Sequence, residues 1–90
     1  MKFTEFITKK SIYVDVVADS QKNVFKILGN LFAKKNSTLS SKIIDNLNER
    51  ERLGSTSIGN GVAIPHTKVE DISKTQVIFL KLSHAINFSA

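Results

Sequence analysis

Residues 54–66 constrain the fold of this chain more than any other segment. They hold three of its four glycines and its only proline, and they end on His66. Glycine and asparagine tolerate positive φ, so the Gly-Asn-Gly run at 59–61 predicts a tight turn. Ile58 and Val62 on either side of it predict a short hairpin. Because the residue before proline favours an extended backbone, the segment is expected to present His66 at or just past a strand end.

The imidazole of His66 suits chemistry near neutral pH, where a histidine side chain can be neutral and nucleophilic. Such a ring can form a covalent phosphoramidate and so divide one transfer into two steps. A structural histidine, with its nitrogens satisfied by the backbone, is the alternative interpretation from these residues alone.

Two amphipathic helices are predicted before this segment. Apolar residues at helical spacing predict the first over residues 20–35, with Asp19 or Ser20 as its N-cap. Gly29 inside this helix costs about 1 kcal/mol relative to alanine, which indicates close packing there. Residues 36–38 are predicted to form a loop.

The second helix is predicted to run from a cap at Ser40 or Ser41 to about Leu53. Gly54 suits the C′ position that follows a last helical turn. The apolar stripe of this helix continues through i+4 and i+3 steps to Arg50. Arg50 is therefore expected to point from the core-facing side toward the segment after Gly54.

Strands are predicted over residues 12–17 and 75–82, which are rich in β-branched and other apolar side chains. The second run is nearly continuous, which predicts burial on both faces. Residues 83–90 alternate weakly, as in a short strand, and residues 1–10 could hold one helical turn. Helices and strands together predict an α/β fold with the helices packed on a mixed β-sheet.

Composition bounds the remaining possibilities. Ninety residues allow one domain at most, and the absence of cysteine excludes disulfides and thiolate chemistry and fits a reducing compartment. No apolar run approaches the ~18 residues of a membrane span, and no signal peptide core is present. The net charge of +5 could attract nucleic acid, but the lysines are scattered, so no nucleic-acid partner is expected.

The run Gly-Ser-Thr-Ser-Ile-Gly-Asn-Gly-Val-Ala-Ile-Pro-His over residues 54–66 resembles the phosphorylation-site signature of a known family. That family is enzyme IIA of the bacterial sugar phosphotransferase system, in its fructose, mannitol and nitrogen-regulatory branch. Glycines, proline and histidine agree over thirteen consecutive positions. The resemblance extends over nearly all of the chain. It implies that residues 1–90 are the N-terminal part of an incomplete enzyme IIA type 2 domain, because the family's domain is longer.

The resemblance implies that His66 is phosphorylated on Nε2 and that Arg50 matches the arginine before the family's Gly-Ser-Thr. A guanidinium suits phosphate because its planar fork of donors fits two oxygens, although a solvated helix-end arginine is the alternative. Ser55 and Thr56 could donate hydrogen bonds to phosphate or merely close the helix end. Lys68 could dock an acidic or phosphorylated partner or be a solvated surface residue.

Members of the family also carry a second histidine that orients the phosphorylated one. His84 does not match its position and is predicted to be an incidental surface residue. No cofactor is expected, since no Asp, Glu or His cluster has metal-ligand spacing. An incomplete sheet has an exposed edge, through which we expect a homo-oligomer to form.

By this resemblance the chain is expected to be a cytoplasmic phosphocarrier. It would accept a phosphoryl group from phospho-HPr, or a homologue of it, on His66 and pass it to enzyme IIB in sugar uptake. One alternative is a nitrogen-branch regulatory protein that signals its phosphorylation state by binding other proteins. A second alternative, based on charge, is a small basic nucleic-acid-binding domain.

Overall fold

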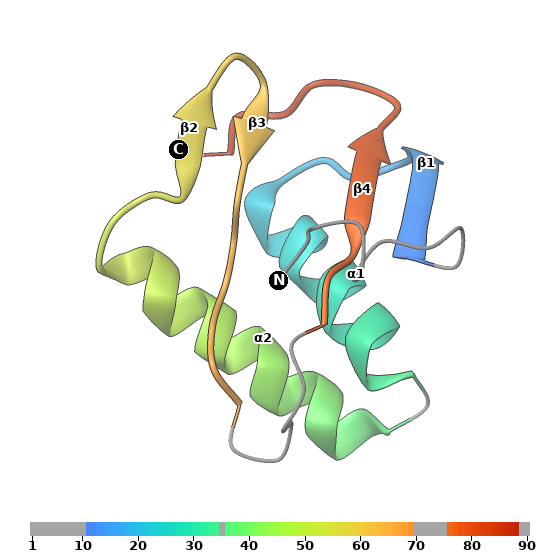
Figure 1. Cartoon of the computed structure of the whole chain (residues 1–90), viewed down its shortest axis with the longest axis vertical. Helices are drawn as coiled ribbons and strands as arrows, with labels where there is room; N and C mark the ends of the chain where they lie inside the picture. The colour runs from blue at the N-terminus through green and yellow to red at the C-terminus, as the bar shows by residue number, and fades with distance from the viewer. Residues whose placement is uncertain (1–10, 35, 70–75, 89–90) are drawn as a thin grey trace.

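The computed structural model describes residues 11–34, 36–69 and 76–88, and in these ranges it contains two helices and two small sheets (Figure 1). The α/β class is confirmed. The turn predicted within residues 1–10 lies outside the described residues. The elements follow one another in the order β1 (Ile12–Val16), α1 (Gln21–Ala33), α2 (Ser37–Arg52), β2 (Ser57–Gly59), β3 (Val62–Ala63) and β4 (Phe79–Leu82).

Helix α1 begins at one of the two predicted caps. The hydroxyl of Ser20 accepts a hydrogen bond from the backbone N–H of Asn23 (3.1 Å), which satisfies a donor that the first helical turn leaves free. The helix buries Val24, Phe25 and Leu28 at i, i+1 and i+4. Val24 and Leu28 are among the apolar residues whose spacing predicts the helix, whereas Phe25 was not expected on the buried face.

Helix α2 begins earlier than predicted, so the expected loop at 36–38 and the caps at Ser40 or Ser41 are wrong. Asn36 is the N-cap, because its Oδ1 accepts from the backbone N–H of Leu39 (3.0 Å). Ser40 instead lies buried inside α2, where its hydroxyl donates to Oδ1 of Asn30 on α1 (2.6 Å). Asparagine is as strong an N-cap as serine, and here it lies first in the chain.

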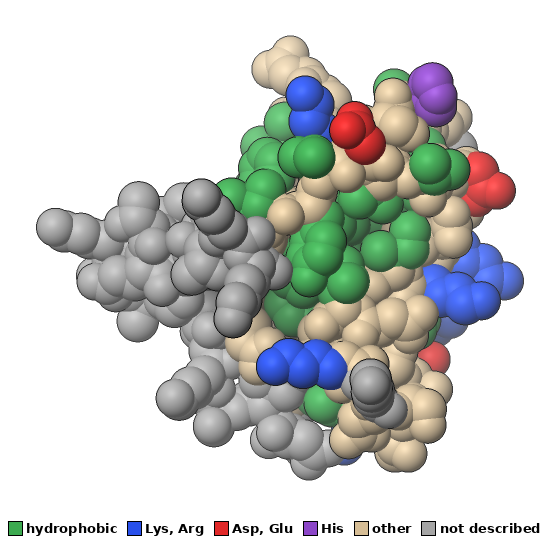
Figure 2. Space-filling view, turned by 90° about the vertical axis from the view of Figure 1, so that its right-hand side faces the viewer, with side chains coloured by type: hydrophobic (Ala, Val, Ile, Leu, Met, Phe, Trp, Pro, Cys, Tyr) green, Lys and Arg blue, Asp and Glu red, His purple; other side chains and the backbone are tan. Residues whose placement is uncertain are grey.

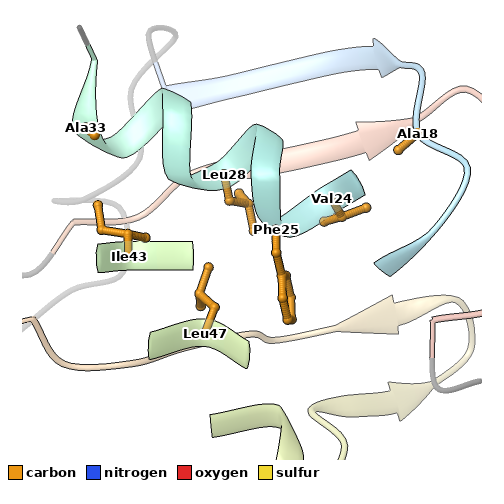
Figure 3. Close-up of a cluster of buried hydrophobic side chains, with 7 residues drawn as sticks. All are labelled: Ala18, Val24, Phe25, Leu28, Ala33, Ile43 and Leu47. Atoms are coloured by element: carbon orange, nitrogen blue, oxygen red, sulfur yellow. The ribbon is translucent and has the colours of Figure 1, made fainter. Parts of the chain in front are cut away.

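The core lies between the two helices and the β1–β4 sheet (Figure 3). Phe25 is its only fully buried large side chain among the described residues, and its ring meets that of Phe88 edge to face at a centroid distance of 5.8 Å. The buried hydrophobic cluster consists of Ala18, Val24, Phe25, Leu28, Ala33, Ile43 and Leu47. This cluster fixes α2 against α1 and so positions the side chains at the C-terminal end of α2.

Strands β1 and β4 pair in parallel, with Ile12 opposite Phe79 and Tyr13 opposite Leu80. The pairing is interrupted by a register shift after Tyr13, where Asp15 adopts a positive φ of 55°. Strand β4 is shorter than the predicted 75–82, because residues 76–78 are not in a strand.

The predicted burial of this strand on both faces is also wrong. Exposed and half-buried side chains alternate along β4, since only its inner face packs against the core. The outer face leaves large apolar side chains on the surface, and hydrophobic side chains gather on this side of the molecule (Figure 2). Those exposed on β1 and β4 or just after β1 are Ile12, Val14, Val17 and Phe79.

The weak strand predicted over 83–90 is not observed in its described part, residues 83–88. Ile86 and Phe88 are half-buried instead, and both pack against the core cluster. Their alternation therefore reflects contact with the core cluster and not pairing in a sheet.

The hairpin predicted around the Gly-Asn-Gly turn is confirmed. Strands β2 and β3 are antiparallel, and the turn between them places Gly59, Asn60 and Gly61 at positive φ values of 86°, 57° and 76°. Glycine and asparagine are the residues that adopt this conformation most readily, so the local sequence determines the turn. The two sheets are separate in the described residues, one parallel and one antiparallel.

Candidate functional site

Arg50 lies in the last turn of α2, where the helix ends in an ordered connection to β2. The backbone N–H of Leu53 donates to the carbonyl of Arg50 and that of Gly54 donates to the carbonyl of Glu51, both at 3.2 Å. Nη1 of Arg50 in turn donates to the carbonyl oxygen of Gly54 (2.9 Å). The guanidinium is therefore held against the start of the segment that leads to His66.

The structure brings Arg50 and His66 together. Nε of Arg50 donates to Nε2 of His66 at 3.4 Å, although sixteen positions separate the two residues in the chain. Arg50 is half-buried, and His66 is exposed. Arg50 thus holds one backbone carbonyl and one imidazole nitrogen with two different nitrogens of the same planar group.

The contact made by Nδ1, the other ring nitrogen of His66, indicates which tautomer the ring adopts. Nδ1 lies 2.9 Å from the carbonyl oxygen of Ile64. A carbonyl can only accept, so Nδ1 carries the proton in this geometry and Nε2 of the neutral ring holds a lone pair. That assignment agrees with the bond from Arg50, because a guanidinium can only donate. The ring is therefore oriented with the lone pair of Nε2 toward Arg50.

The segment after β3 runs alongside α2 (Figure 1). Nδ2 of Asn46, one helical turn before Arg50, donates to the carbonyl oxygen of Lys68 (3.3 Å), and Val69 packs against the core. The segment around His66 is thus attached to α2 at two points, by Arg50 at His66 and by Asn46 at Lys68. The side chain of Lys68 is exposed, and nothing in the described part of the structure ties it to His66.

Thr56 lies close to the site, but both of its donors are engaged. Its backbone N–H donates to Oε2 of Glu51 (2.9 Å), and its hydroxyl donates to Oε1 of the same carboxylate (2.8 Å). Thr56 is 6% exposed, so these bonds are shielded from water. Phosphate binding by Thr56 would require the carboxylate to leave. Ser55 is exposed, and its hydroxyl oxygen accepts from the backbone N–H of Ser57 (3.1 Å).

Glu51 and Asn46 were not among the residues singled out from the sequence. Glu51 follows Leu47 by four positions and therefore lies on the apolar face of α2, but no motif pairs a glutamate with a threonine five positions later. A signal for Asn46 existed only in its position one turn before Arg50 on the same helix.

The model of one family matches residues 5–90, and its description is "Phosphoenolpyruvate-dependent sugar phosphotransferase system, EIIA 2". The chain belongs to this EIIA 2 family. The match covers nearly the whole chain, including both helices and the residues from Arg50 to Lys68 described above.

Several relatives of this EIIA 2 chain are named nitrogen regulatory proteins. A nitrogen regulatory protein of Klebsiella oxytoca is 32% identical over 91 residues, covering 100% of this chain and 56% of its own length. One of Pseudomonas aeruginosa is also 32% identical, with 59% of its length covered. The crystal structure of nitrogen regulatory protein IIA-Ntr from Neisseria meningitidis superposes with a TM-score of 0.86 at 30% identity, covering 96% of this chain and 59% of that one. The chain therefore spans little more than half the length of these relatives.

Elsewhere in this EIIA 2 chain, His84 is exposed, as predicted. The described residues contain no group of three His, Cys, Asp or Glu side chains that could hold a metal ion. Within the same ranges, no helix has the length and hydropathy that a membrane span requires.

Proposed function

We propose that this chain belongs to a nitrogen-branch regulatory protein that is phosphorylated on Nε2 of His66 and signals that state by binding other proteins. The observation that carries the proposal is the contact between Nε of Arg50 and Nε2 of His66, made while Nδ1 is held by the carbonyl of Ile64. A nucleophilic nitrogen and a guanidinium thus lie side by side, and the reacting tautomer is set in advance.

The bond changes of the transfer involve these groups directly. The lone pair on Nε2 of His66 attacks phosphorus, and the bond between phosphorus and the donor's histidine nitrogen breaks, with its electron pair returning to the donor. Nδ1 keeps its proton, so the phosphorylated ring gains a positive charge that the Ile64 carbonyl stabilises. Arg50 exchanges its bond to Nε2 for bonds to phosphate oxygens, since phosphoryl transfer depends mainly on positioning and charge neutralisation.

The proposed donor is a phosphorylated carrier protein, HPr or its nitrogen-branch homologue. Lys68 and Ser55 are exposed beside the segment that carries His66, where a docking partner could reach them. Phosphate contacts by Ser55, and by Thr56 after release from Glu51, stay predictions. We place the reaction in the cytoplasm, because a chain without cysteine fits a reducing compartment.

The nitrogen branch is preferred because the relatives described above are named nitrogen regulatory proteins. The sugar-uptake alternative, in which His66 passes its phosphoryl group to enzyme IIB, is supported by the family description and by two relatives that match at lower identity or over less of this chain and are named mannitol- and fructose-specific components. That residues 1–90 form the N-terminal part of a longer EIIA domain also stays a prediction.

Phosphorylation is tested by incubating the protein with phosphorylated HPr or its nitrogen-branch homologue and measuring intact mass and acid lability. We expect one acid-labile phosphate, with ³¹P NMR assigning it to Nε2. The chain offers a matched pair of variants, because it holds two histidines. His66→Ala should abolish the modification and His84→Ala should retain it. A phosphate that persists in His66→Ala would refute the proposal, as would a wild-type protein that accepts none.

The branch is tested by adding enzyme IIB to the phosphorylated protein. Retention of phosphate on His66 supports a regulatory role, and rapid loss to IIB supports sugar uptake. Binding of DNA with a steep salt dependence would favour the nucleic-acid alternative instead.

Self-association is proposed for the outer face of the β1–β4 sheet, where Ile12, Val14 and Phe79 are exposed. In the part of the chain that the structure describes, β1 and β4 each pair on one side only, and an exposed apolar face beside such edges favours association. Light scattering should detect oligomers that Val14→Lys converts to monomers. A monomeric wild-type protein at high concentration would contradict this.

A further inference from the structure

We propose that Glu51 is a positioning residue for His66, which it orients through Thr56 and Ile64. The inference rests on the proposed phosphorylation of His66 for its functional consequence, whereas its structural part does not. It begins with the carboxylate of Glu51, which accepts from both the backbone N–H and the hydroxyl of the buried Thr56 (2.9 and 2.8 Å).

The next contact joins Thr56 to the segment after β3 that carries the histidine. The carbonyl oxygen of Thr56 accepts from the backbone N–H of Ile64 at 2.9 Å. The carbonyl of Ile64 then lies 2.9 Å from Nδ1 of His66. A series of hydrogen bonds through the backbone of Thr56 and Ile64 thus links the carboxylate of Glu51 to Nδ1 of His66, whose proton determines the tautomer of the ring.

Arg50 and Glu51 are neighbours in the last turn of α2, and each holds a different point of the same connection. Arg50 holds the carbonyl of Gly54, and Glu51 holds Thr56 two residues later. Because Arg50 also contacts Nε2 directly, the two side chains fix the imidazole from both of its nitrogens. Arg50 acts on the reacting atom, and Glu51 acts at the far end through the backbone.

Loss of the Glu51 carboxylate would leave two buried donors on Thr56 without an acceptor. The connection would shift to satisfy them, and Ile64 would move with it. The Ile64 carbonyl would then hold Nδ1 less firmly, so the ring would populate both neutral tautomers. Protonation of Nε2 in the second tautomer removes the lone pair that attacks phosphorus, and transfer slows without any loss of donor binding.

The test compares Glu51→Ala with Glu49→Ala. Glu49 lies on the same helix and is exposed, and its carboxylate pairs with Arg52 and not with the connection. Ring ¹⁵N NMR of His66 at about pH 8, where histidine is neutral, reads the tautomer. We expect one Nδ1–H tautomer in wild type and in Glu49→Ala, and a mixture in Glu51→Ala. The maximal phosphorylation rate of Glu51→Ala should fall roughly tenfold with an unchanged KM for the donor, because small misplacements of a reacting group are costly.

Two milder variants keep the proposal testable if Glu51→Ala does not fold. Thr56→Ser keeps both donors and should behave as wild type, whereas Glu51→Gln keeps only one acceptor and should show an intermediate tautomer mixture. Wild-type tautomer populations in folded Glu51→Ala and Glu51→Gln would overturn the proposal, as would an equal effect of Glu49→Ala. If wild type accepts no phosphate, the proposed function fails, but the NMR result still decides whether Glu51 orients His66.

Discussion

Gly29 on α1 faces Ile44 on α2 so closely that a Cβ on Gly29 would lie 2.5 Å from Cγ1 of Ile44. The same Cβ would lie 2.9 Å from Cδ1 of Ile44 and 3.1 Å from the backbone oxygen of Ser40. Real Cβ atoms essentially never lie under 3.0 Å from another atom, so a side chain on Gly29 would force Ile44 or the helix backbone to shift.

Gly29→Ala should therefore destabilise the protein. Alanine would gain up to about 1 kcal/mol of helix propensity, but overpacking a core typically costs about 1–3 kcal/mol. We expect a net loss of roughly 1–2 kcal/mol in the free energy of unfolding, measured by urea titration. The double variant Gly29→Ala/Ile44→Ala makes room for the methyl group and should show a smaller effect of the glycine change. A more stable Gly29→Ala would show that the side chain of Ile44 simply rotates away.

The sequence predicts this close approach because a glycine inside an otherwise regular helix needs a packing reason. It likewise predicts the hairpin, since Gly-Asn-Gly encodes the turn in three adjacent residues. It did not locate the start of α2, because Asn36, Ser40 and Ser41 are all good caps and propensity alone cannot rank them. The inner and outer faces of β4 were also missed, because burial there depends on what covers the sheet.

The proximity of Arg50 and His66 can be predicted from short-range patterns in the sequence. The apolar stripe of α2 leads to Arg50, and a helix end at Gly54 returns the chain toward it. The bond between Glu51 and Thr56 has no such pattern, since it depends on how the chain leaves the helix. The sequence therefore indicated which side chains meet, and the structure was needed to find what holds them.

Arg50→Lys tests the need for a planar group. An ammonium cannot contact the Gly54 carbonyl and Nε2 of His66 with two nitrogens in a fixed geometry, as Arg50 does. We expect the phosphorylation rate to fall on the order of 10²-fold, as for removal of one aligned donor at other transfer sites. Arg52→Lys is the matched control, because Arg52 is exposed and pairs only with Glu49 in the described contacts. Similar rates for the two variants would contradict a role for Arg50.

Gly61→Ala tests the backbone of the hairpin turn. Gly61 has a φ of 76°, and nothing lies within 4 Å of where its Cβ would be, so any effect comes from the backbone alone. A left-handed conformation costs about 1–2 kcal/mol for an alanine. The expected loss of stability should appear as a lower thermal midpoint. Asn60→Gly, at a φ of 57°, is the control and should be nearly neutral. An unchanged midpoint in Gly61→Ala would mean that the turn adopts another conformation.

Phe25→Leu tests the centre of the core. Phe25 is completely buried and meets Phe88 edge to face. Leucine keeps an apolar side chain but loses the aromatic pair, which is worth about 0.5–1.5 kcal/mol, and it leaves some space unfilled. We expect a loss of about 1–3 kcal/mol in chemical denaturation. Val14→Leu, on the exposed outer face of β1, should change little. Equal effects of the two changes would place Phe25 outside the cooperative core.

The exposure of His66 has a consequence for how long a signal could last. A phosphoryl group on an exposed ring meets bulk water on its outer side, and an N–P bond is open to hydrolysis there. Its half-life would then be set by solvent unless a bound partner shields it. The phosphorylated state of such a protein would be short-lived and would report recent supply of the donor. A partner that covers the ring would lengthen the lifetime of that state.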